Sequence, residues 1–565
     1  MKKLDVLFLN LHRRYLNFEA TYGGFLGIYY LSAFLRKECY EAKGFSGTLI
    51  KGKKILDELC AENKISMVGL YCDYDNVTEN IFISRHVKEL YNLPVIVGGP
   101  QATALDQKFF HESKCDAVVL GEGELTVLEL AKFFIDDCGD LSKINGIVYP
   151  KGNKLIKTPA RPLIKNLDEL PFITADCYLE PFKFHLGLNL MTGRGCPFHC
   201  TFCHEGIGNG VRFRSAENVL AEIDEYLKLW TAEELCFHFT DDTFTLNSER
   251  VKKICFGINE RRKARKLEFF CEGHVHTLYK NPELIPLLAD SGCYGIQLGI
   301  ESGNNHVLKA YGKNTTAEEI LEVVSRCCVA GIQQIFGNII LGGAFFCAET
   351  YETDKNFIRQ LLDIGKGVVE LSVVTFLPLP NTQMTLCPSD FGIKIYDAEF
   401  LTSVGDFSQT ETTYFNRITI AEKQAELENF ILETMLELIK SRQIPTEKIL
   451  HWFKESPKHK SAWFTALTQL ENIYSYYEML YLGEGTESKD IDNLALAHPL
   501  RLIPIYKHLK QLAENFSFKE LEVIMLTTGK LSVAQIAEKV SLSTTKVIDV
   551  LNRMEKKFLI IYNHY

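Results

Sequence analysis

The sequence predicts an α/β chain with two successive sheet-and-helix domains, followed by a helical C-terminal region. Two stretches, 1–145 and 187–400, alternate short apolar runs with helical patterns, and the last third of the chain loses this alternation. Alternation of β and α segments is typical of parallel sheets covered by helices. A chain of 565 residues also exceeds the size of a single core. We predict a Rossmann-type doubly wound sheet of flavodoxin type, a partial (β/α)6 TIM-like barrel, and a C-terminal helical region that ends in a winged-helix-like module.

The composition is that of an ordinary globular protein, with 46% hydrophobic residues and a net charge of −10. An acidic balance argues against a large nonspecific nucleic-acid surface. Outside one dense loop, the 17 cysteines are mostly scattered singly, as in reduced cytosolic proteins. The apolar run Leu4–Leu9 is too short for a signal core, and no apolar stretch is long enough to span a bilayer. We therefore expect a cytoplasmic protein without a membrane partner.

The first domain, 1–145, is expected to bind a ligand at the carboxyl ends of its strands. Its elements are predicted from buried apolar runs and amphipathic stretches: strands Leu4–Leu9, Ile65–Leu70, Pro94–Val97 and Ala117–Leu120, and helices Gly24–Leu35, Glu79–Leu90 and Glu124–Phe134. Ligands in such sheets bind in the crevice formed by the loops that follow the strands. Two of these loops are rich in glycine, which lets the backbone approach a ligand closely; they contain Gly98, Gly99, Gln101 and Thr103, and Gly121, Glu122, Gly123 and Glu124.

A connector, 146–186, begins with a predicted hairpin and leads to the second domain, 187–400. That domain has six predicted strands: Leu188–Met191, Leu235–Phe239, Glu268–Cys271, Tyr294–Ile300, Ile335–Leu341 and Leu371–Phe376. Helical patterns such as Ala216–Leu227 and Thr316–Ala330 separate them. In barrels of this kind the chemistry lies at the carboxyl ends of the strands. The first predicted strand ends at the dense cysteine loop.

That loop contains Cys196, Cys200 and Cys203, with Gly195 before them and Phe202 just before the last thiol. Thiolates at this spacing can converge on a soft metal centre if the chain loops around it, and they select zinc, copper(I) or iron–sulfur clusters. Three ligands without an obligatory fourth suit a cluster that leaves one iron open. The alternatives are a zinc loop that recruits His199 or His204, and three buried thiols without a metal.

The C-x3-C-x2-C spacing with its aromatic residue resembles the cluster loop of the radical S-adenosylmethionine (SAM) superfamily. The resemblance implies a 4Fe–4S cluster held by the three cysteines, with SAM on the open iron. It also implies an electron donor such as flavodoxin or ferredoxin. By the same resemblance, a set of residues at the strand ends would contact SAM: Phe202, Asp241, Asp242, Glu301, Ser302, Gly337, Ile339 and Gly342. Arg212 to Ser215 resembles the basic segment after the loop, and Asn381 stands where the family usually has glycine.

The two glycine loops of the first domain, in this order ahead of the cysteine loop, resemble the cobalamin-binding domain of one class in that superfamily. Tyr22, Gly23 and Gly24 resemble the segment before the first helix of that domain. The stretch after the first strand lacks the D-x-H-x-x-G motif that supplies a lower cobalt ligand. His12 is the only histidine nearby, and we expect it in a surface loop. The resemblance implies cobalamin without a histidine lower ligand; a degenerate domain that binds no cobalamin is the alternative.

The C-terminal part divides into a helical region, 401–514, and a module, 515–565. The first contains a long amphipathic helix, Ala421–Ser441. The second predicts helices capped by Ser532 and Ser543 that resemble a helix-turn-helix, and a final strand. Acidic residues on the would-be recognition helix favour a protein or peptide partner over nucleic acid. The predicted elements are Lys519–Thr527, Val533–Val540, Thr544–Lys556 and Phe558–Tyr562.

These features predict a cobalamin-dependent radical SAM enzyme that methylates a carbon of a small-molecule or peptide substrate. One alternative keeps the cofactors but performs cyclisation, rearrangement or hydrogen abstraction. Another treats the chain as a cobalamin-linked DNA-binding regulator. No catalytic acid or base can be assigned, although His274 and His276 follow a predicted strand and could face the cavity.

Overall fold

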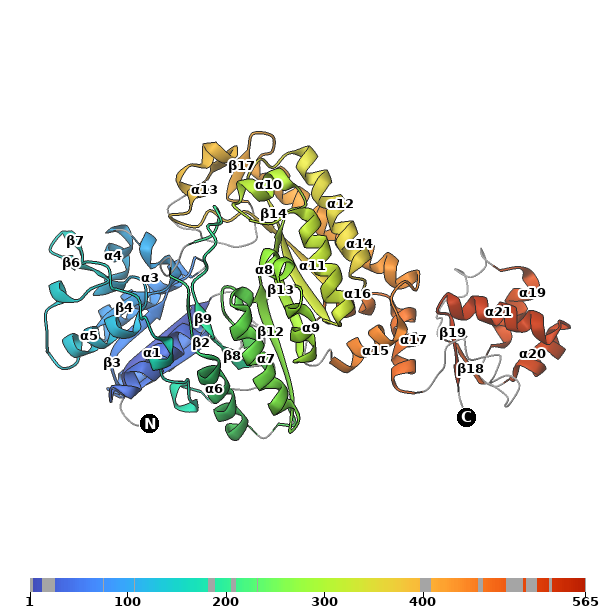
Figure 1. Ribbon diagram of the computed structural model, residues 1–565, viewed down its shortest axis with the longest axis horizontal. Helices are drawn as coiled ribbons and strands as arrows, with labels where there is room; N and C mark the ends of the chain where they lie inside the picture. The colour runs from blue at the N-terminus through green and yellow to red at the C-terminus, as the bar shows by residue number, and fades with distance from the viewer. Residues whose placement is uncertain are drawn as a thin grey trace. The chain divides into compact units, whose positions relative to one another are not determined.

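The structure is a computed structural model that describes residues 4–12, 26–74, 76–105, 107–180, 188–204, 210–230, 232–396, 408–455, 461–483, 501–504, 516–527 and 531–563. The chain divides into two compact units. One unit contains residues 1–364 and 371–428, and the other contains residues 365–370 and 429–565. Both large sheets belong mainly to the first unit (Figure 1).

The N-terminal sheet has seven strands in the order β2-β1-β3-β4-β5-β6-β7. The first five pair in parallel, and the last two continue the sheet as an antiparallel edge. The order reverses at β1, which lies between β2 and β3, and this is the kind of switch point where α/β sheets bind ligands. The strands are β1 (Leu4–His12), β2 (Ala42–Thr48), β3 (Ile65–Tyr71), β4 (Val95–Gly98), β5 (Ala117–Val119), β6 (Ile147–Lys151) and β7 (Lys154–Lys157).

Helices cover both faces of this sheet, as Figure 1 shows. On one face, buried side chains of α2 (Leu49–Ala61), α3 (Val77–Leu90) and α4 (Gln107–Ser113) pack on the strands. On the other face, α1 (Leu26–Lys37) and α5 (Glu124–Phe134) do the same. The sheet is therefore doubly wound, as the alternating pattern predicts.

The second sheet has six strands in the order β15-β14-β13-β12-β11-β8, with helices on its outer side. Consecutive strands from β8 to β14 pair in parallel, so their carboxyl ends lie at one edge. The strands are β8 (Leu188–Leu190), β11 (Glu234–Phe239), β12 (Lys266–Gly273), β13 (Cys293–Glu301), β14 (Gln334–Leu341) and β15 (Val369–Thr375), and the main outer helices are α6 (Ala216–Leu229), α7 (Ser248–Arg262), α9 (Leu284–Asp290), α11 (Ala317–Ala330) and α12 (Ala348–Ile364).

Side chains on these strands alternate between fully buried and half-buried positions. In β12 and β14 every second residue is buried under the helices, while its neighbours face the concave side and keep some exposure. This period of two is the expected result of a pleated strand with helices on one side only. We call the residues buried under the helices the outer row of a strand, and the half-buried residues between them its inner row.

The second unit is mostly helical and ends in a small module. After α14 (Arg417–Lys440), which begins in the first unit, come α15 (Thr446–Glu455), α16 (Ala462–Thr468) and α17 (Glu471–Tyr481). The module contains α19 (Phe518–Leu526), α20 (Val533–Val540) and α21 (Thr544–Lys556), and β18 (Arg501–Pro504) pairs antiparallel with β19 (Ile560–Asn563). Ser532 and Ser543 cap α20 and α21 through their side chains, as predicted.

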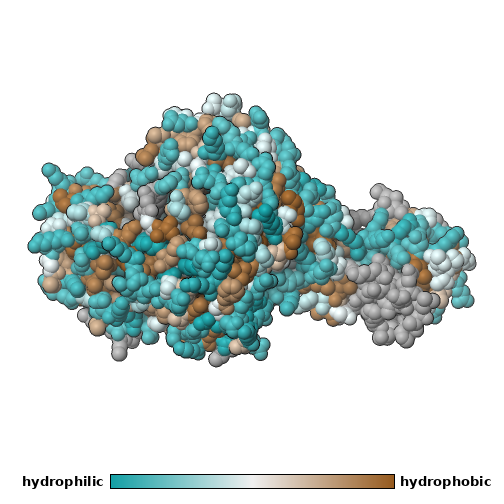
Figure 2. Space-filling view, viewed as in Figure 1, coloured by the Kyte–Doolittle hydropathy of each residue, from teal (hydrophilic) through white to brown (hydrophobic). Residues whose placement is uncertain are grey.

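The surface in Figure 2 is largely hydrophilic, with apolar residues distributed among polar ones. Among the exposed large apolar side chains are Ile50 on α2, Phe256 on α7 and Val329 on α11, which belong to different helices. None of the helices that the structure describes combines the length and the apolar character needed to cross a membrane.

Candidate functional site

The three cysteines lie in the loop that follows the short strand β9 (Gly193–Arg194), just after β8. The loop is anchored to the carboxyl edge of the second sheet by main-chain contacts. The amide of Gly195 donates to the Asp242 carboxylate at 3.1 Å. The amide and hydroxyl of Thr201 donate to the carbonyls of Tyr311 (3.0 Å) and Ala310 (2.9 Å). The predicted position of the loop at the end of the first barrel strand is confirmed.

The thiols of the loop remain close enough to influence one another. Burial, together with the neighbouring Cys200 and Cys196, raises the pKa of Cys203 to about 12. Burial likewise raises the pKa of Cys200. Within the described residues, no three His, Cys, Asp or Glu side chains are arranged to hold a single metal ion. Three cysteines of one loop that influence one another's titration form a donor set that suits a four-iron cluster, whose ligands bind different irons.

Two aromatic residues of the loop pack in different directions. Phe198 stacks on His274, with ring centres 3.6 Å apart and planes 12° from parallel. Phe202 meets the edge of Tyr311 at 5.1 Å and packs with Ile340 around a buried apolar cluster. These contacts tie the loop to the ends of β12 and β14.

His274 directly follows β12 and is only 7% exposed. Neither of its ring nitrogens has a hydrogen-bond partner among the described residues. Burial, together with the positive charge of Lys313 and the neighbouring His276, lowers its pKa to about 3. His274 is therefore a neutral imidazole that packs against the cysteine loop.

The acidic end of β13 holds an ion pair that no sequence motif predicted. Lys313 lies 3.2 Å from the Glu301 carboxylate, and both side chains are largely buried. Gly299 leaves room for this pair, because a Cβ there would stand 2.3 Å from the Lys313 ammonium nitrogen. Glu301 has a positive φ of 62° at an irregularity in the β13–β14 pairing. Left-handed backbone in a non-glycine residue is concentrated at functional sites.

A second acid, Glu272, occupies the inner row of β12. Burial, together with the negative charges of Asp242 and Asp241, raises its pKa to about 7. The described contacts of Glu272 include no hydrogen bond or ion pair. A half-buried carboxylate of this kind is a candidate for binding a cationic group.

Two of the predicted SAM contacts, Asp241 and Ser302, have partners within the protein. Asp241 is 2% exposed, accepts a hydrogen bond from the Thr192 amide at 2.5 Å, and lies 3.7 Å from Arg250. Ser302 is buried, and its hydroxyl donates to Asp354 at 2.7 Å. Asp242, next in sequence to Asp241, reaches the cysteine loop.

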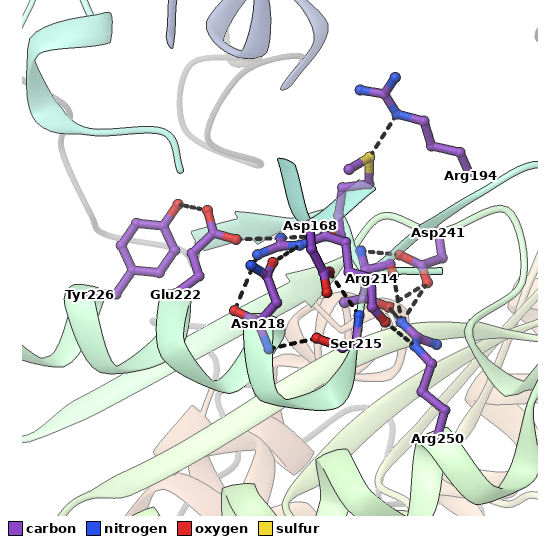
Figure 3. Close-up of polar contacts among 11 residues, drawn as sticks. Asp168, Arg194, Arg214, Ser215, Asn218, Glu222, Tyr226, Asp241 and Arg250 are labelled. Carbon is purple, nitrogen blue, oxygen red and sulfur yellow. Dashed lines mark hydrogen bonds and ion pairs between the residues drawn. The ribbon is translucent and has the colours of Figure 1, made fainter. Parts of the chain in front are cut away.

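Figure 3 shows the network around Asp241, to which Arg214 and Arg250 belong. Arg250 donates to the Arg214 carbonyl at 3.0 Å, and Arg214 forms an ion pair with Glu222 at 2.5 Å. The predicted basic segment therefore serves as buried scaffolding at Arg214.

The predicted nucleoside strand, β14, presents alternate residues to the two sides. Ile339 is fully buried, and a Cβ at Gly337 would meet Ile300 at 2.3 Å, so both belong to the outer row. Asn338 and Ile340 form the inner row instead. Gly342 has a positive φ of 69° and accepts a hydrogen bond from Thr410 on its carbonyl. Gly337 and Ile339 can therefore reach a ligand in the barrel only through their main chain.

The first glycine loop follows β4 and forms a short 3-10 helix, η2 (Pro100–Ala104). Gly99 has a φ of 120°, and a Cβ there would collide with the Cys72 carbonyl at 2.5 Å. Gly98 is the last residue of β4, and Gln101 is buried. The side-chain amide of Asn381 donates a hydrogen bond to the hydroxyl of the exposed Thr103 at 3.4 Å. Asn381 has a φ of 63°, so it keeps the left-handed conformation that the family's glycine would adopt.

The second glycine loop follows β5 and carries two acids with fixed partners. Arg194 donates to Glu122 at 2.9 Å and to Glu124 at 2.5 Å, and Arg212 also donates to Glu122. Gly121 has a φ of 76° with open space where a Cβ would stand. This loop therefore offers a ligand its main chain at Gly121 and Gly123 rather than free carboxylates.

The remaining predicted cobalamin contacts, Tyr22, Gly23 and Gly24, lie outside the described residues. The expectation of His12 in a surface loop is wrong. His12 ends β1, pairs with Thr48 in the strand ladder and is 4% exposed. The apolar run of β1 continues through Leu11, beyond the predicted end of the strand at Leu9.

Comparisons with known proteins agree with this geometry. Residues 190–358 match the model of the radical SAM superfamily. An uncharacterized methyltransferase of Pyrococcus horikoshii is 29% identical over 377 residues, 64% of this chain and 78% of that protein.

Two solved structures have a similar fold. The radical SAM methyltransferase TsrM from Kitasatospora setae, with cobalamin and a 4Fe–4S cluster bound, gives a TM-score of 0.59 at 17% identity, over 77% of this chain and 89% of that chain. The cobalamin-dependent SAM radical enzyme OxsB, with aqua-cobalamin and SAM bound, gives 0.61 at 19% identity, over 98% and 80% of the two chains.

The cysteine loop at the first strand end, the parallel six-stranded sheet around it and the family match over the same residues agree with one another. Residues 190–358 of the chain form a radical SAM domain.

Proposed function

We propose that the protein is a cobalamin-dependent radical SAM enzyme that methylates a carbon centre of its substrate. The observation that carries the proposal is the place of the cysteine loop. It is bound on one side to the carboxyl edge of the second sheet, through Asp242, and it adjoins the second glycine loop of the first sheet through Arg194. The two edges where α/β folds bind ligands thus adjoin each other.

The residues fit three cofactors. Cys196, Cys200 and Cys203 would hold a 4Fe–4S cluster, the inner row of the second sheet would hold SAM, and the glycine loops after β4 and β5 would hold cobalamin. When bound, these groups supply reductive cleavage of SAM to a 5′-deoxyadenosyl radical, hydrogen abstraction from an unactivated carbon, and a transferable methyl group. The protein supplies binding, orientation and exclusion of water.

The SAM site that we propose differs from the one the motifs predicted. Glu301 and Lys313 form a buried pair beside Cys200, and Lys313 can donate to a carboxylate while Glu301 accepts from hydroxyl groups. Glu272 offers a carboxylate for a cationic group, and Ile340 with Phe202 offers an apolar surface. Phe202, Asp242 and Glu301 are retained from the predicted set, and Asp242 contacts the cysteine loop through the Gly195 amide.

The proposed cobalamin site consists mainly of main-chain groups of the two glycine loops. Gly99 and Gly121 hold backbone conformations that other residues adopt only with strain, at the carboxyl edge of the sheet. TsrM and OxsB carry cobalamin in their solved structures. Binding without a histidine lower ligand stays part of the proposal, as do the flavodoxin-type and winged-helix assignments.

A second candidate keeps the cofactors without methyl transfer. It is favoured by the similarity to OxsB, a cobalamin-dependent SAM radical enzyme. The substrate is proposed to be a small molecule, as in TsrM with tryptophan bound, or a peptide presented by the C-terminal module. Electrons would come from a flavodoxin or ferredoxin.

Anaerobic purification of the full chain, with iron, sulfide and cobalamin quantified, tests the proposal. We expect a cluster and one cobalamin per chain, and SAM cleavage after reduction. Cys200→Ala should lose the visible iron–sulfur absorbance and SAM cleavage, while Cys138→Ala, at an exposed thiol outside the loop, should retain both.

Wild-type SAM cleavage by Cys200→Ala would refute the cluster assignment. Mass spectrometry of product then separates the two candidates, because methylation adds one CH2 to the substrate and consumes an additional SAM. A product without that mass increase favours the second candidate.

A further inference from the structure

Arg194 links the cysteine loop to the first sheet. It ends β9, two residues before Cys196, and its guanidinium contacts two carboxylates of the loop after β5. One terminal nitrogen donates to Glu122 at 2.9 Å, and the other donates to Glu124 at 2.5 Å. The exposed fraction is 12% for the Arg194 side chain and 3–4% for the two acids.

The electrostatics of this contact show that the charges depend on one another. Burial alone would raise the pKa of Glu122, but hydrogen bonds from Arg194 and from the Ile164 amide hold it below its usual range. Burial alone would lower the pKa of Arg194, yet Glu124 and Glu122 raise it well above its usual value. Removing one partner would leave buried charge uncompensated, which proteins tolerate poorly.

A second arginine reinforces the same point. Arg212 lies opposite Arg194 in the antiparallel pair of β9 and β10 (Arg212–Phe213). It donates to both oxygens of Glu122, at 2.9 and 3.0 Å, and to the Ile164 carbonyl at 2.7 Å. The strands on either side of the cysteine loop in sequence therefore both bind Glu122.

The geometry of this contact suits a positioning role. Glu122 and Glu124 follow β5, at the sheet edge where a ligand is proposed to bind, and Arg194 borders the proposed cluster ligands. A single guanidinium thus spans the two cofactor sites. Its planar fork can engage two carboxylates at once, which a lysine ammonium on a flexible stem does not reproduce.

We propose that Arg194 is a positioning residue that fixes the ligand crevice of the first sheet relative to the cysteine loop, and so couples SAM cleavage to use of the cobalamin methyl group. The inference rests on the proposed function. It also gives the acids of the second glycine loop a role other than contact with cobalamin. A purely structural role would affect stability without changing how the two cofactor sites work together.

The experiment uses the full chain with cluster and cobalamin reconstituted, and compares wild type with Arg194→Lys and Arg194→Gln. The matched control is Arg261→Gln, which breaks a bidentate pair with Asp224 (2.6 and 2.5 Å) between the outer helices α7 and α6. Each variant is measured for melting temperature, iron content, 5′-deoxyadenosine formed and methylated product, with the magnetic interaction between reduced cluster and cob(II)alamin followed by EPR.

We expect Arg194→Lys to form 5′-deoxyadenosine within about twofold of wild type, while product per SAM cleaved falls at least about fivefold, because small misplacements reduce transfer steps strongly. The cluster–cobalamin magnetic interaction should weaken in the same variant. Arg261→Gln should change the melting temperature only. An unchanged product ratio and an unchanged magnetic interaction in Arg194→Lys would overturn the inference.

If the Arg194 variants fail to fold, Glu124→Gln keeps the side-chain shape and removes one charge, and the same changes are expected in weaker form. If the wild-type chain binds no cobalamin, that part of the proposed function fails together with the coupling, and hydrogen exchange tests the positioning role of Arg194 by itself. Arg194→Lys should then speed exchange in Gly121–Glu124 and in the described part of the cysteine loop together, whereas faster exchange in one of them alone contradicts it.

Discussion

Gly312 packs directly against the main chain of His199 in the cysteine loop. A Cβ at Gly312 would stand 2.7 Å from the His199 carbonyl oxygen, and the φ of Gly312 is 69°. The loop that would hold the cluster is thus shaped by a glycine more than a hundred residues away in sequence. Gly312 directly follows Tyr311, whose carbonyl accepts a hydrogen bond from the Thr201 amide.

Gly312→Ala should therefore lower cluster incorporation. Two effects combine: left-handed backbone costs an alanine about 1–2 kcal/mol, and the new methyl group has to displace the His199 carbonyl, which is fixed main chain. Iron content and visible absorbance after identical reconstitution measure the result.

Gly331→Ala is the matched control, because Gly331 is also left-handed (φ 90°) but has nothing within 4 Å of its Cβ position. It should lose stability by a similar strain and keep full iron content. Equal iron content in both variants would show that Gly312 does not shape the loop.

Ser302→Ala should destabilise the protein without weakening SAM binding. The Ser302 hydroxyl donates to Asp354 at 2.7 Å in a buried site, and burial raises the pKa of Asp354 to about 6. Removing the Ser302 hydroxyl leaves Asp354 with the Gly303 amide as its remaining hydrogen-bond donor among the described residues, at a cost of about 1–3 kcal/mol. A lowered melting temperature with an unchanged SAM dissociation constant is expected; the reverse result would restore Ser302 to the SAM site.

The fold could be predicted where local signals agree with the final structure. Helices α20 and α21 occupy the ranges that the periodicity predicts, because serine caps fix where they begin. Neither β2 nor α2 is predicted from the sequence. For β2 the reason is that Ala42–Thr48 contains two glycines and few β-branched residues. This strand forms because it pairs along β1, which is information that its own residues do not contain.

The site divides in the same way. The three cysteines are local in sequence, so their spacing was sufficient to find them. The pair of Glu301 and Lys313 depends on how the chain returns after β13, and Lys313 belongs to no motif. Asp241 and Asp242 could not be told apart, because only the folded strand decides which of two adjacent side chains turns toward Thr192 and which toward Gly195.

Lys313→Met should weaken SAM binding at least about tenfold, which corresponds to about 1.4 kcal/mol. The substitution removes the cation next to Cys200 and leaves Glu301 buried without its partner. Anaerobic equilibrium dialysis with labelled SAM measures the affinity, and iron content shows whether the cluster is intact. Lys309→Met, at an exposed position of α10 (Asn305–Ala310), should behave like wild type. Equal affinity in the two variants would exclude Lys313 from the SAM site.

The affinity for SAM should rise with pH through the titration of Glu272. Burial, together with Asp242 and Asp241, raises the pKa of Glu272 to about 7, so its carboxylate is mostly protonated below that value and mostly charged above it. Because SAM presents cationic groups, the charged form should bind it more tightly, and affinity should increase from about pH 6 to about pH 8. Glu272→Gln should bind more weakly and lose this dependence. Glu268→Gln changes another inner-row acid of β12 that is already paired with Lys266 at 2.9 Å, so its pH profile should match wild type. A profile that persists in Glu272→Gln would assign the titration to another group and remove Glu272 from the site.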